Sequence, residues 1–367
     1  MHEQSVMIAD DPPEQCREQF PVLRDCVYLD TGSAGLTFSG QARAAAQFYE
    51  DKAQGYSRRD LWLSRGTAIR QRIADWLDVL SGEIEFFSGT TDALNIVAHS
   101  IDWQPGDEIV VAADEFASVR LAWLVAERAG AIIRLVSIPG EGQREDALID
   151  ALSARTRVLV VAHVHSITGT RLDLQRLGSA CRSHDCLFVV DGIHALGATP
   201  VDLDQVDVYV SGVFKWLLSG FGLAIAIIRE RARKELRPAF RGYLNQPPDD
   251  GLQFAHVNYP GLYALEASLQ LLGETIGWPT VHARTAALVQ WLADELQAGG
   301  LELAAPKGAR AGIASVLVPD SEGLRRSLAE QEMYVAAKGK YLRVSPFFYN
   351  SRRDIERFAA HFLRLCS

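Results

Sequence analysis

Lys215 is the residue from which the chemistry of this sequence is best argued. It lies between two apolar runs, VDVYVSG at 206–212 and GLAIAII at 222–228, which have the composition of buried strands in an α/β sheet. Phe214 and Trp216 flank it, and an amine in such surroundings has a lowered pKa and can attack a carbonyl carbon. An isolated lysine more often extends its amine from a loop into water, so the assignment depends on the residues that accompany it.

Asp191 ends another apolar run, CLFVVD at 186–191. A carboxylate at the end of a central strand is costly to bury unless it has a cationic partner, which indicates a positive charge on a ligand. An aspartate in this position can also cap the next helix. His194, three residues later, would face the same crevice if a short turn follows, although a lone histidine often has only a structural partner.

Thr90 and Thr91 mark a candidate phosphate site. They lie in SGTTDALN at 88–95, where the apolar run EIEFF changes to a helical pattern. Backbone N–H groups at a helix N-terminus, together with two hydroxyls, suit a phosphate group. A threonine that simply caps the helix explains the same residues equally well.

Other apolar runs are also followed by residues that could contact a ligand. Phe116 follows DEIVVAA and could cover a flat ring or belong to the core, and Ser166 follows TRVLVVAHV. The loop DTGSAG at 30–35 contains Ser33 among small residues that let a ligand approach the backbone. Because the carboxyl ends of parallel strands meet at one edge of a sheet, we expect these residues to lie around one crevice.

The order of apolar and helical stretches predicts an α/β fold. From residue 83 onward, seven strand-like runs occur with helical stretches between them, which predicts a mostly parallel seven-stranded sheet covered by helices on both faces. We expect residues 1–24 to form an N-terminal arm and 25–263 a large domain. Residues 264–367 should form a smaller α+β domain, with the substrate in the cleft between the two.

Composition limits the classes of partner. No apolar run approaches the roughly 20 residues of a membrane span, and the N-terminal segment is too acidic and polar for a signal peptide, so we expect a cytoplasmic protein without membrane contacts. A formal charge of −9 without a Lys/Arg block argues against nucleic acid. The five cysteines have no metal-binding spacing, so we expect reduced cysteines and no metal. A small molecule is the expected ligand.

The candidate residues occur in an order that one cofactor would require. Pyridoxal 5′-phosphate (PLP) needs a helix N-terminus for its phosphate, an aromatic face for its ring, a carboxylate for its ring nitrogen and an amine for its aldehyde. Thr90, Phe116, Asp191 and Lys215 supply these groups in turn. The sequence therefore predicts PLP as the cofactor.

The chain resembles the class V aminotransferases of PLP fold type I, which include cysteine desulfurases and isopenicillin N epimerase-like proteins. Asp191 and Lys215 are 24 residues apart, and the likeness covers almost the whole chain. The stretches that carry it are, in order, YLDTGSAGL, SGTTDALN, DEFASVRLAW, AHVHSITGTRLDL, VVDGIHALGATPVDL, SGVFKWLLSGFG and YLRVSPFFYN.

The resemblance implies a role for each residue near the ring. Lys215 would be the Schiff-base lysine and proton carrier, and Asp191 the partner of the pyridine nitrogen. Phe116 falls at the stacking position, where many relatives have histidine. His194 would lie near the phenolic oxygen of the ring, and so would Ser166, where relatives often have asparagine.

The phosphate contacts implied by the resemblance are incomplete. Thr90 and Thr91 match the phosphate-binding turn. Relatives commonly place a histidine and a serine near the phosphate where this chain has Phe214 and Gly212. We therefore expect Ser211, or a partner chain, to contribute.

Substrate contacts are also implied. Arg343, in YLRVSPFFYN, matches the arginine that binds the α-carboxylate, although an ordinary surface arginine on a strand would explain the same residue. Ser33 is a further substrate-binding candidate. The stretch FAHVNYPGLYAL at 254–265 resembles a segment that reaches into the neighbouring subunit's site, so Asn258 would complete a pocket in a homodimer with shared active sites.

The implied activity is α-proton abstraction from a small amino acid or derivative, by a transaminase or a lyase. An epimerase of the isopenicillin N epimerase type and a non-catalytic PLP-binding protein are the alternatives. A nucleotide-binding α/β protein would use the 88–94 turn but has no use for the lysine. A cysteine desulfurase is disfavoured because no cysteine lies between Cys186 and Cys366.

Overall fold

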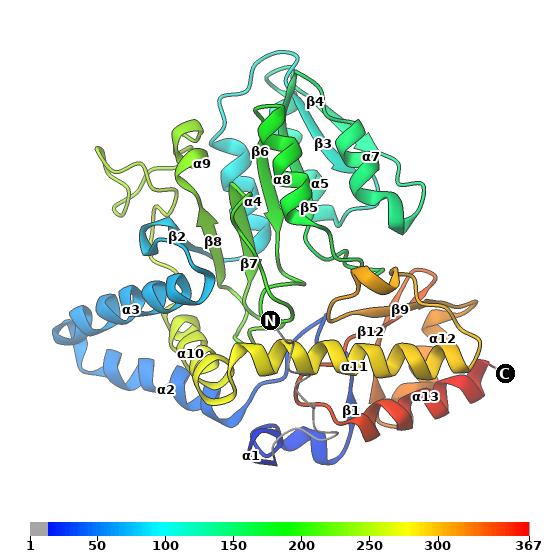
Figure 1. Cartoon of the computed structure of the whole chain (residues 1–367). Helices are drawn as coiled ribbons and strands as arrows, with labels where there is room; N and C mark the ends of the chain where they lie inside the picture. Colours follow the sequence, from blue (N-terminus) through cyan, green and yellow to red (C-terminus); the bar gives the residue numbers. More distant parts are fainter. Residues whose placement is uncertain (1–13, 367) are drawn as a thin grey trace, which may run out of the picture.

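The computed structural model describes residues 14–366 of the chain. Residues 1–13 of the predicted N-terminal arm lie outside the described residues. A large sheet with its helices occupies the upper part of the view in Figure 1, and a smaller unit built from the C-terminal residues lies below it.

The central sheet contains the seven predicted strands. In spatial order they are β2 (Ile84–Phe87), β8 (Ala224–Ile228), β7 (Val208–Gly212), β6 (Leu187–Asp191), β5 (Thr156–Ala162), β3 (Glu108–Ala112) and β4 (Ile132–Val136). Strand β8 is antiparallel to both of its neighbours, and every other adjacent pair is parallel. The prediction of a mostly parallel sheet is confirmed.

Apolar residues on both sides of each strand give the sheet two buried faces. In β5, Val158 and Val160 belong to one apolar cluster, whereas Leu159 and Val161 belong to the other. The first cluster also includes residues of α4 (Thr90–His99), α5 (Ala117–Leu121) and α6 (Leu124–Glu127). The second includes residues of α3 (Arg59–Leu77), α7 (Arg144–Asp150) and α8 (Leu174–Ser183).

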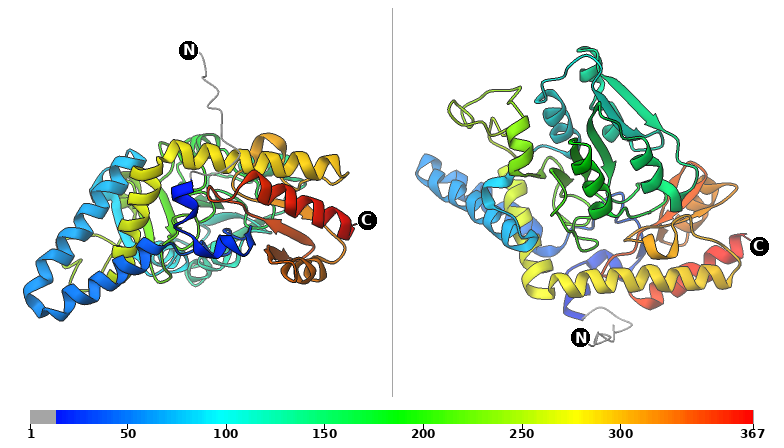
Figure 2. Two further views of the ribbon diagram at one scale, coloured as in Figure 1. Left: turned by 90° about the horizontal axis from the view of Figure 1, so that it is seen from below. Right: turned by 45° about the horizontal axis from the view of Figure 1, so that its top comes forward.

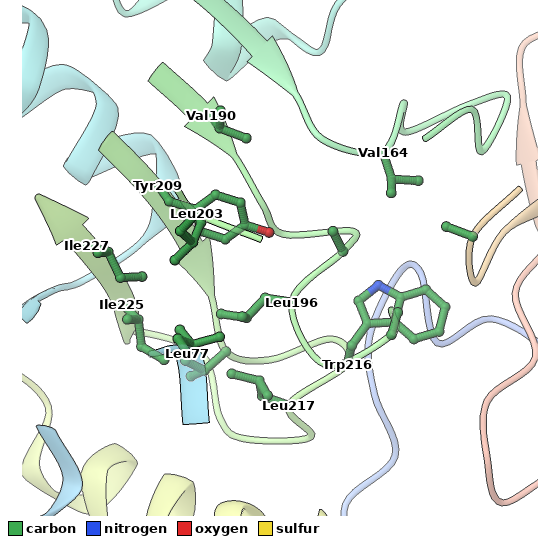
Figure 3. Packing of buried hydrophobic residues seen from close by; sticks show 14 of the residues in the cluster. Leu77, Val164, Val190, Leu196, Leu203, Tyr209, Trp216, Leu217, Ile225 and Ile227 are labelled. Carbon is green, nitrogen blue, oxygen red and sulfur yellow. The ribbon is translucent and has the colours of Figure 1, made fainter. Parts of the chain in front are cut away.

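Figure 3 shows part of this second cluster at the carboxyl end of the sheet. Ile225 of β8 lies beside Leu77, the last residue of α3, Tyr209 of β7 lies beside Leu203, and Trp216 follows in the loop after β7. The indole of Trp216 is 1% exposed, so the residue after Lys215 is fixed in the core.

Three helices form a layer at one end of the sheet. Helix α2 (Ser39–Ala53) and α3 run side by side beyond the sheet in Figures 1 and 2, and α10 (Tyr259–Leu269) contacts both. The short helices α1 (Glu14–Arg17) and α9 (Glu230–Glu235) lie at the N-terminus and after β8.

The C-terminal unit is built on a small antiparallel sheet. Its strands are β11 (Ala336–Lys338), β12 (Tyr341–Val344) and β9 (Ala314–Leu317), in that spatial order. A separate apolar cluster joins this sheet to three helices, α11 (Trp278–Ala298), α12 (Ser321–Ala329) and α13 (Arg352–Cys366).

The N-terminal strand belongs by its contacts to this C-terminal unit. Strand β1 (Val27–Tyr28) pairs in parallel with β10 (Met333–Tyr334), and Val27 packs in the C-terminal apolar cluster. The predicted limit at residue 263 falls inside α10. The domain limits stay predictions, but the pairing of β1 brings the loop at 30–35 to the junction of the two units.

Residues 14–366 contain neither a membrane-spanning helix nor a cluster of metal-binding side chains. No helix in that range is both long and apolar enough to cross a membrane. It also contains no group of three or more His, Cys, Asp or Glu side chains placed to hold a metal ion. The five cysteines are unpaired, and Cys366 is the exposed one.

Candidate active site

The amine of Lys215 lies at the carboxyl edge of the central sheet, in contact with His194. Its Nζ is 3.0 Å from His194 Nε2. Burial, reinforced by the charge of Arg343, lowers the pKa of Lys215 to about 7, while the charge of Asp191 opposes this shift. Burial also holds the pKa of His194 well below its usual value, so the imidazole is neutral and its Nε2 is within hydrogen-bond distance of the amine. An amine with these properties is partly uncharged near neutral pH and can act as a nucleophile.

Asp191 is the last residue of β6 and lies level with Ala162 of β5 and Val210 of β7. It is 4% exposed, and its Oδ1 accepts a hydrogen bond of 2.9 Å from the backbone N–H of Ile193. Burial raises the pKa of the carboxyl to about 6, although the Ile193 amide and the charge of Lys215 favour the carboxylate. A protonated ring nitrogen beside this carboxyl would stabilise its charged form.

The loop at 30–35 packs against the backbone carbonyls of Phe214 and Lys215. Gly35 donates its N–H to the carbonyl of Phe214 at 2.9 Å. A Cβ on Gly35 would lie 2.1 Å from the carbonyl oxygen of Lys215, so only glycine allows this approach. The small-residue loop noted in the sequence therefore packs directly against the lysine segment.

The candidate phosphate turn contacts the end of β7. Thr90 accepts a hydrogen bond from the N–H of Gly212 at 2.8 Å, and the Thr91 and Ser118 hydroxyls are 2.7 Å apart. Ser211 is less favourably placed. It is fully buried and donates to the carbonyl of Gly212, and side-chain alternation directs it to the face of the sheet opposite Thr90.

Phe116 is 56% exposed in the single chain and immediately precedes α5. The preceding Glu115 is a residue that the sequence analysis missed. Its carboxyl is buried between β3 and β5, accepts a hydrogen bond of 3.0 Å from the N–H of Ala162, and has a pKa that burial raises to about 7. The only sequence signal was its position next to Phe116.

Arg343 of β12 reaches from the C-terminal unit to the loop at 30–35. Its Nη2 donates to Ser33 Oγ at 2.7 Å and lies 3.4 Å from Asp30 Oδ1, and its Nη1 donates to the carbonyl of Ser166 at 2.8 Å. Its Nε is buried and has no hydrogen-bond partner among the described residues. The structure thus brings together Arg343, Ser33 and Ser166, with Asp30 as an anionic neighbour that the sequence analysis did not single out.

Asn258 has structural partners within its own chain. Its Oδ1 accepts a hydrogen bond from the N–H of Gly261 and caps α10, and its Nδ2 donates to the carbonyl of Phe221. These contacts fix the loop that follows Lys215. A substrate contact for Asn258 stays a prediction.

Comparisons with known proteins agree with this fold. The structure of a C-DES variant with glycine covalently linked to its PLP cofactor has the same fold, with a TM-score of 0.88, 21% identity and coverage of 95% of this chain and 98% of that chain. A mostly parallel seven-stranded sheet with a smaller C-terminal unit is PLP fold type I, as predicted.

The family follows from the sequence. The model of the aminotransferase class-V family matches residues 27–358, and the chain therefore belongs to this family. Cysteine desulfurase CsdA of Escherichia coli is 29% identical over 71% of this chain and 71% of its own length. Isopenicillin N epimerase of Amycolatopsis lactamdurans is 29% identical over 79% of this chain and 82% of its own length.

Membership confirms PLP as the predicted cofactor, and the residues present fit it. Lys215 offers an amine and Asp191 a buried carboxyl at the same sheet edge. His194 Nδ1 is buried without a hydrogen-bond partner among the described residues, which leaves a polar atom for a ligand. Gly212 has no side chain where a Cβ would lie 3.2 Å from Thr90 Oγ1, which leaves room beside the phosphate turn.

Proposed function

We propose that this protein is a PLP-dependent enzyme that removes the α-proton of a small amino acid or derivative. The observation that carries the proposal is the buried amine of Lys215, which has a pKa of about 7 and lies 3.0 Å from a neutral imidazole. A lysine in a purely structural role gains nothing from such a position, because burial of an amine without a carboxylate partner costs free energy.

We propose a chemical role for each residue that lines the crevice. When bound, PLP supplies an aldehyde that bonds to an amine and a ring that withdraws electrons from the substrate's α-carbon. Lys215 would hold the aldehyde until the amino group of the substrate takes its place, and the released Nζ would then accept the α-proton, while Asp191 would keep the ring nitrogen protonated. Phe116 covers the ring, and Arg343 binds the α-carboxylate.

His194 and the hydroxyl residues complete the proposed site. His194 orients the lysine amine through its hydrogen bond and offers Nδ1 towards polar ligand atoms. Thr90 and Thr91 would hold the phosphate at the start of α4, where the N-cap residue Gly89 has no side chain to bind the first backbone N–H groups. Ser211 and Ser166 remain candidates for cofactor contacts.

A transaminase or a lyase is the proposed reaction type. A persulfide mechanism needs a cysteine that reaches the substrate, and no cysteine occurs between Cys186 and Cys366. Strands β11 and β12 pair from Lys338 to Tyr341, so only two residues form the turn between them. This segment offers no loop that could carry a sulfur group into the crevice.

Epimerisation is the second candidate. The likeness to isopenicillin N epimerase extends over 329 residues, compared with 289 for the desulfurase CsdA. Epimerisation requires a proton donor on the face of the substrate opposite Lys215, and Phe116 cannot supply one. We therefore rank it below transamination and elimination.

We also propose a cytoplasmic homodimer. Several large apolar side chains in the segments after β3, β7 and β8 are exposed in the single chain, which is typical of a surface covered by a partner. They include Phe116 at 56%, Leu121 at 52%, Phe221 at 68% and Tyr243 at 55% exposure. The neighbouring Asn258 would then lie close to the partner's crevice.

The assignment of Lys215 is tested with Lys215→Ala and the exposed-lysine control Lys340→Ala. Both purified variants are mixed with PLP, and the visible absorption band of the bound cofactor is recorded. We expect Lys215→Ala to lose the band and Lys340→Ala to keep it. A Lys215→Ala protein that retained the wild-type band would refute the assignment.

Reaction type is tested by offering the common amino acids with and without an α-keto acid acceptor. Product formation that requires the acceptor identifies a transaminase, and ammonia and keto acid without an acceptor identify a lyase. Loss of α-proton exchange with every amino acid, in a protein that binds PLP, would instead support a non-catalytic role.

A further inference from the structure

Lys338 shares a face of the small sheet with Arg343. Ala336 lies opposite Arg343 and Lys338 opposite Tyr341 in the antiparallel pair of β11 and β12. Opposite residues project to the same side of a sheet, and so do residues two apart in one strand, so Lys338 and Arg343 are diagonal neighbours. Leu342 projects to the other side, into the C-terminal apolar cluster.

This shared face is the one directed at the crevice. Arg343 uses it to reach Ser33 and the carbonyl of Ser166. The amine of Lys338 is close enough for its positive charge to lower the pKa of both Lys215 and His194. Lys338 is therefore a second cation beside the substrate arginine, at the edge of the same site.

Lys338 has no strong partner of its own. The side chain is partly buried, and it forms no hydrogen bond or ion pair with any residue in the range 14–366. Burial and the charge of Arg343 lower the pKa of its amine, and Asp30 opposes this. Asp30, however, already lies 3.4 Å from Arg343.

Charge balance indicates what would complete this arrangement. Arg343 and Lys338 carry two positive charges, and Asp30 supplies one negative charge. Asp30 already lies beside Arg343, and the α-carboxylate of a neutral amino acid would also bind Arg343, so Lys338 would keep no anionic partner. An amino acid with a second acidic group would supply that partner.

We propose that Lys338 is a subsite for a second acidic group, so that the substrate is an α-amino acid whose side chain carries a carboxylate or a similar anion. Arg343 then binds the α-carboxylate and Lys338 the distal group. The identity of the substrate class rests on the proposed function, but the binding of a diacid at these two cations can be measured without turnover.

The test compares glutarate with pentanoate, which has the same number of carbons and one carboxylate. Neither has an amino group, so both bind the PLP-loaded enzyme without reacting, and affinity is measured by calorimetry. We expect glutarate to bind more tightly than pentanoate. Lys338→Gln should weaken glutarate about tenfold or more, since a hydrogen bond to a charged group is lost, and leave pentanoate within about twofold.

Two further variants locate the effect. Lys340→Gln removes the same charge from the adjacent turn, where the side chain is exposed, and should leave both affinities unchanged. Arg343→Gln should weaken both ligands. Melting temperatures of all variants, measured alongside, show that they are folded.

The proposal is overturned if wild-type enzyme binds glutarate no better than pentanoate. It is also overturned if Lys340→Gln weakens glutarate as much as Lys338→Gln does. Lys338-dependent binding of glutarate in a protein that turns over no amino acid would refute the proposed enzymatic function and leave the diacid subsite standing. Turnover confined to neutral amino acids would refute the diacid subsite and leave the proposed enzymatic function standing.

Discussion

The reactivity of Lys215 is set by groups from three separate parts of the chain. Burial and the guanidinium of Arg343 favour the neutral amine, and the carboxylates of Asp191 and Asp30 favour the charged amine. The hydrogen bond between Lys215 Nζ and the neutral His194 orients the amine. The pKa of about 7 is thus a balance that single substitutions should move in either direction.

The first prediction concerns this balance. Only the neutral amine attacks the aldehyde, so the rate at which apoprotein forms the visible band with PLP should rise with pH, with a midpoint of about 7. Arg343→Gln should move the midpoint up, because a positive neighbour is removed, and Asp30→Asn should move it down. Stopped-flow absorbance measures these rates. A midpoint near 10.5, the usual value for lysine, would contradict the buried position of the amine.

The second prediction concerns Arg343 in catalysis. Arg343→Gln should raise the KM for amino-acid substrates roughly tenfold to a hundredfold, because a charged hydrogen bond of about 1.5–3 kcal/mol is lost. Initial-rate kinetics measure the effect. Arg326→Gln, on the exposed face of α12, is the matched control and should leave KM unchanged. An unaltered KM in Arg343→Gln would mean that another residue binds the carboxylate.

At the scale of elements, the loop at 30–35 joins the two units. Its first residues continue β1, which pairs with β10, and its last residue bonds to the backbone beside Lys215. The carboxyl ends of β6 and β7 supply Asp191 and the lysine loop, and β12 supplies Arg343. The site therefore depends on how the loop at 30–35 and β12 dock against the ends of β6 and β7. The closest approach of the loop is made by Gly35.

The third prediction tests this docking. Gly35→Ala places a Cβ 2.1 Å from the carbonyl oxygen of Lys215, and moving the two segments apart would strain the hydrogen bond from Gly35 N–H to the Phe214 carbonyl. We expect the free energy of unfolding to fall by about 1–3 kcal/mol and PLP affinity to fall with it.

Gly66→Ala is the control for the glycine substitution, because nothing lies within 4 Å of the added Cβ in the interior of α3. It should stabilise the protein by about 0.5–1 kcal/mol. Thermal unfolding measures both variants. A Gly35→Ala protein as stable as wild type, with unchanged PLP affinity, would show that the loop is not tightly docked.

For the whole molecule, the exposed apolar residues around the crevice argue for association. Phe221 stacks on Phe214, the residue before the lysine, with ring centroids 4.4 Å apart, and it is itself 68% exposed. A partner chain on this surface would shield the crevice from water and add contacts for the phosphate that Phe214 and Gly212 cannot provide.

The fourth prediction is therefore a homodimer. Light scattering should give twice the 40.4 kDa mass of one chain, and Phe221→Asp should shift the equilibrium towards single chains, because a charge is buried at the contact. The control is Tyr56→Asp, an exposed aromatic on the distant turn between α2 and α3. A wild-type protein that has the mass of one chain at every concentration would contradict the prediction.

Much of the fold and the cofactor could be predicted from sequence because they depend on local patterns. Each of the seven strands is a short apolar run, and buried strands in a parallel sheet are apolar along their whole length. Asp191 and Lys215 follow directly from such runs. The order of these motifs along the chain was enough to identify the cofactor and the family.

The tertiary structure alone decided which distant residues act on the lysine. Asp30 and Lys338 lie in segments whose sequences show no sign of this effect, because their positions depend on strand register and on the docking of β1 and β12. The structure also decided the direction of Ser211. Neighbouring residues of β7 face opposite sides of the sheet, so Gly212 contacts Thr90 and the hydroxyl of Ser211 lies on the other face. Local composition determines which elements form, whereas charge balance in the crevice arises from contacts over hundreds of residues.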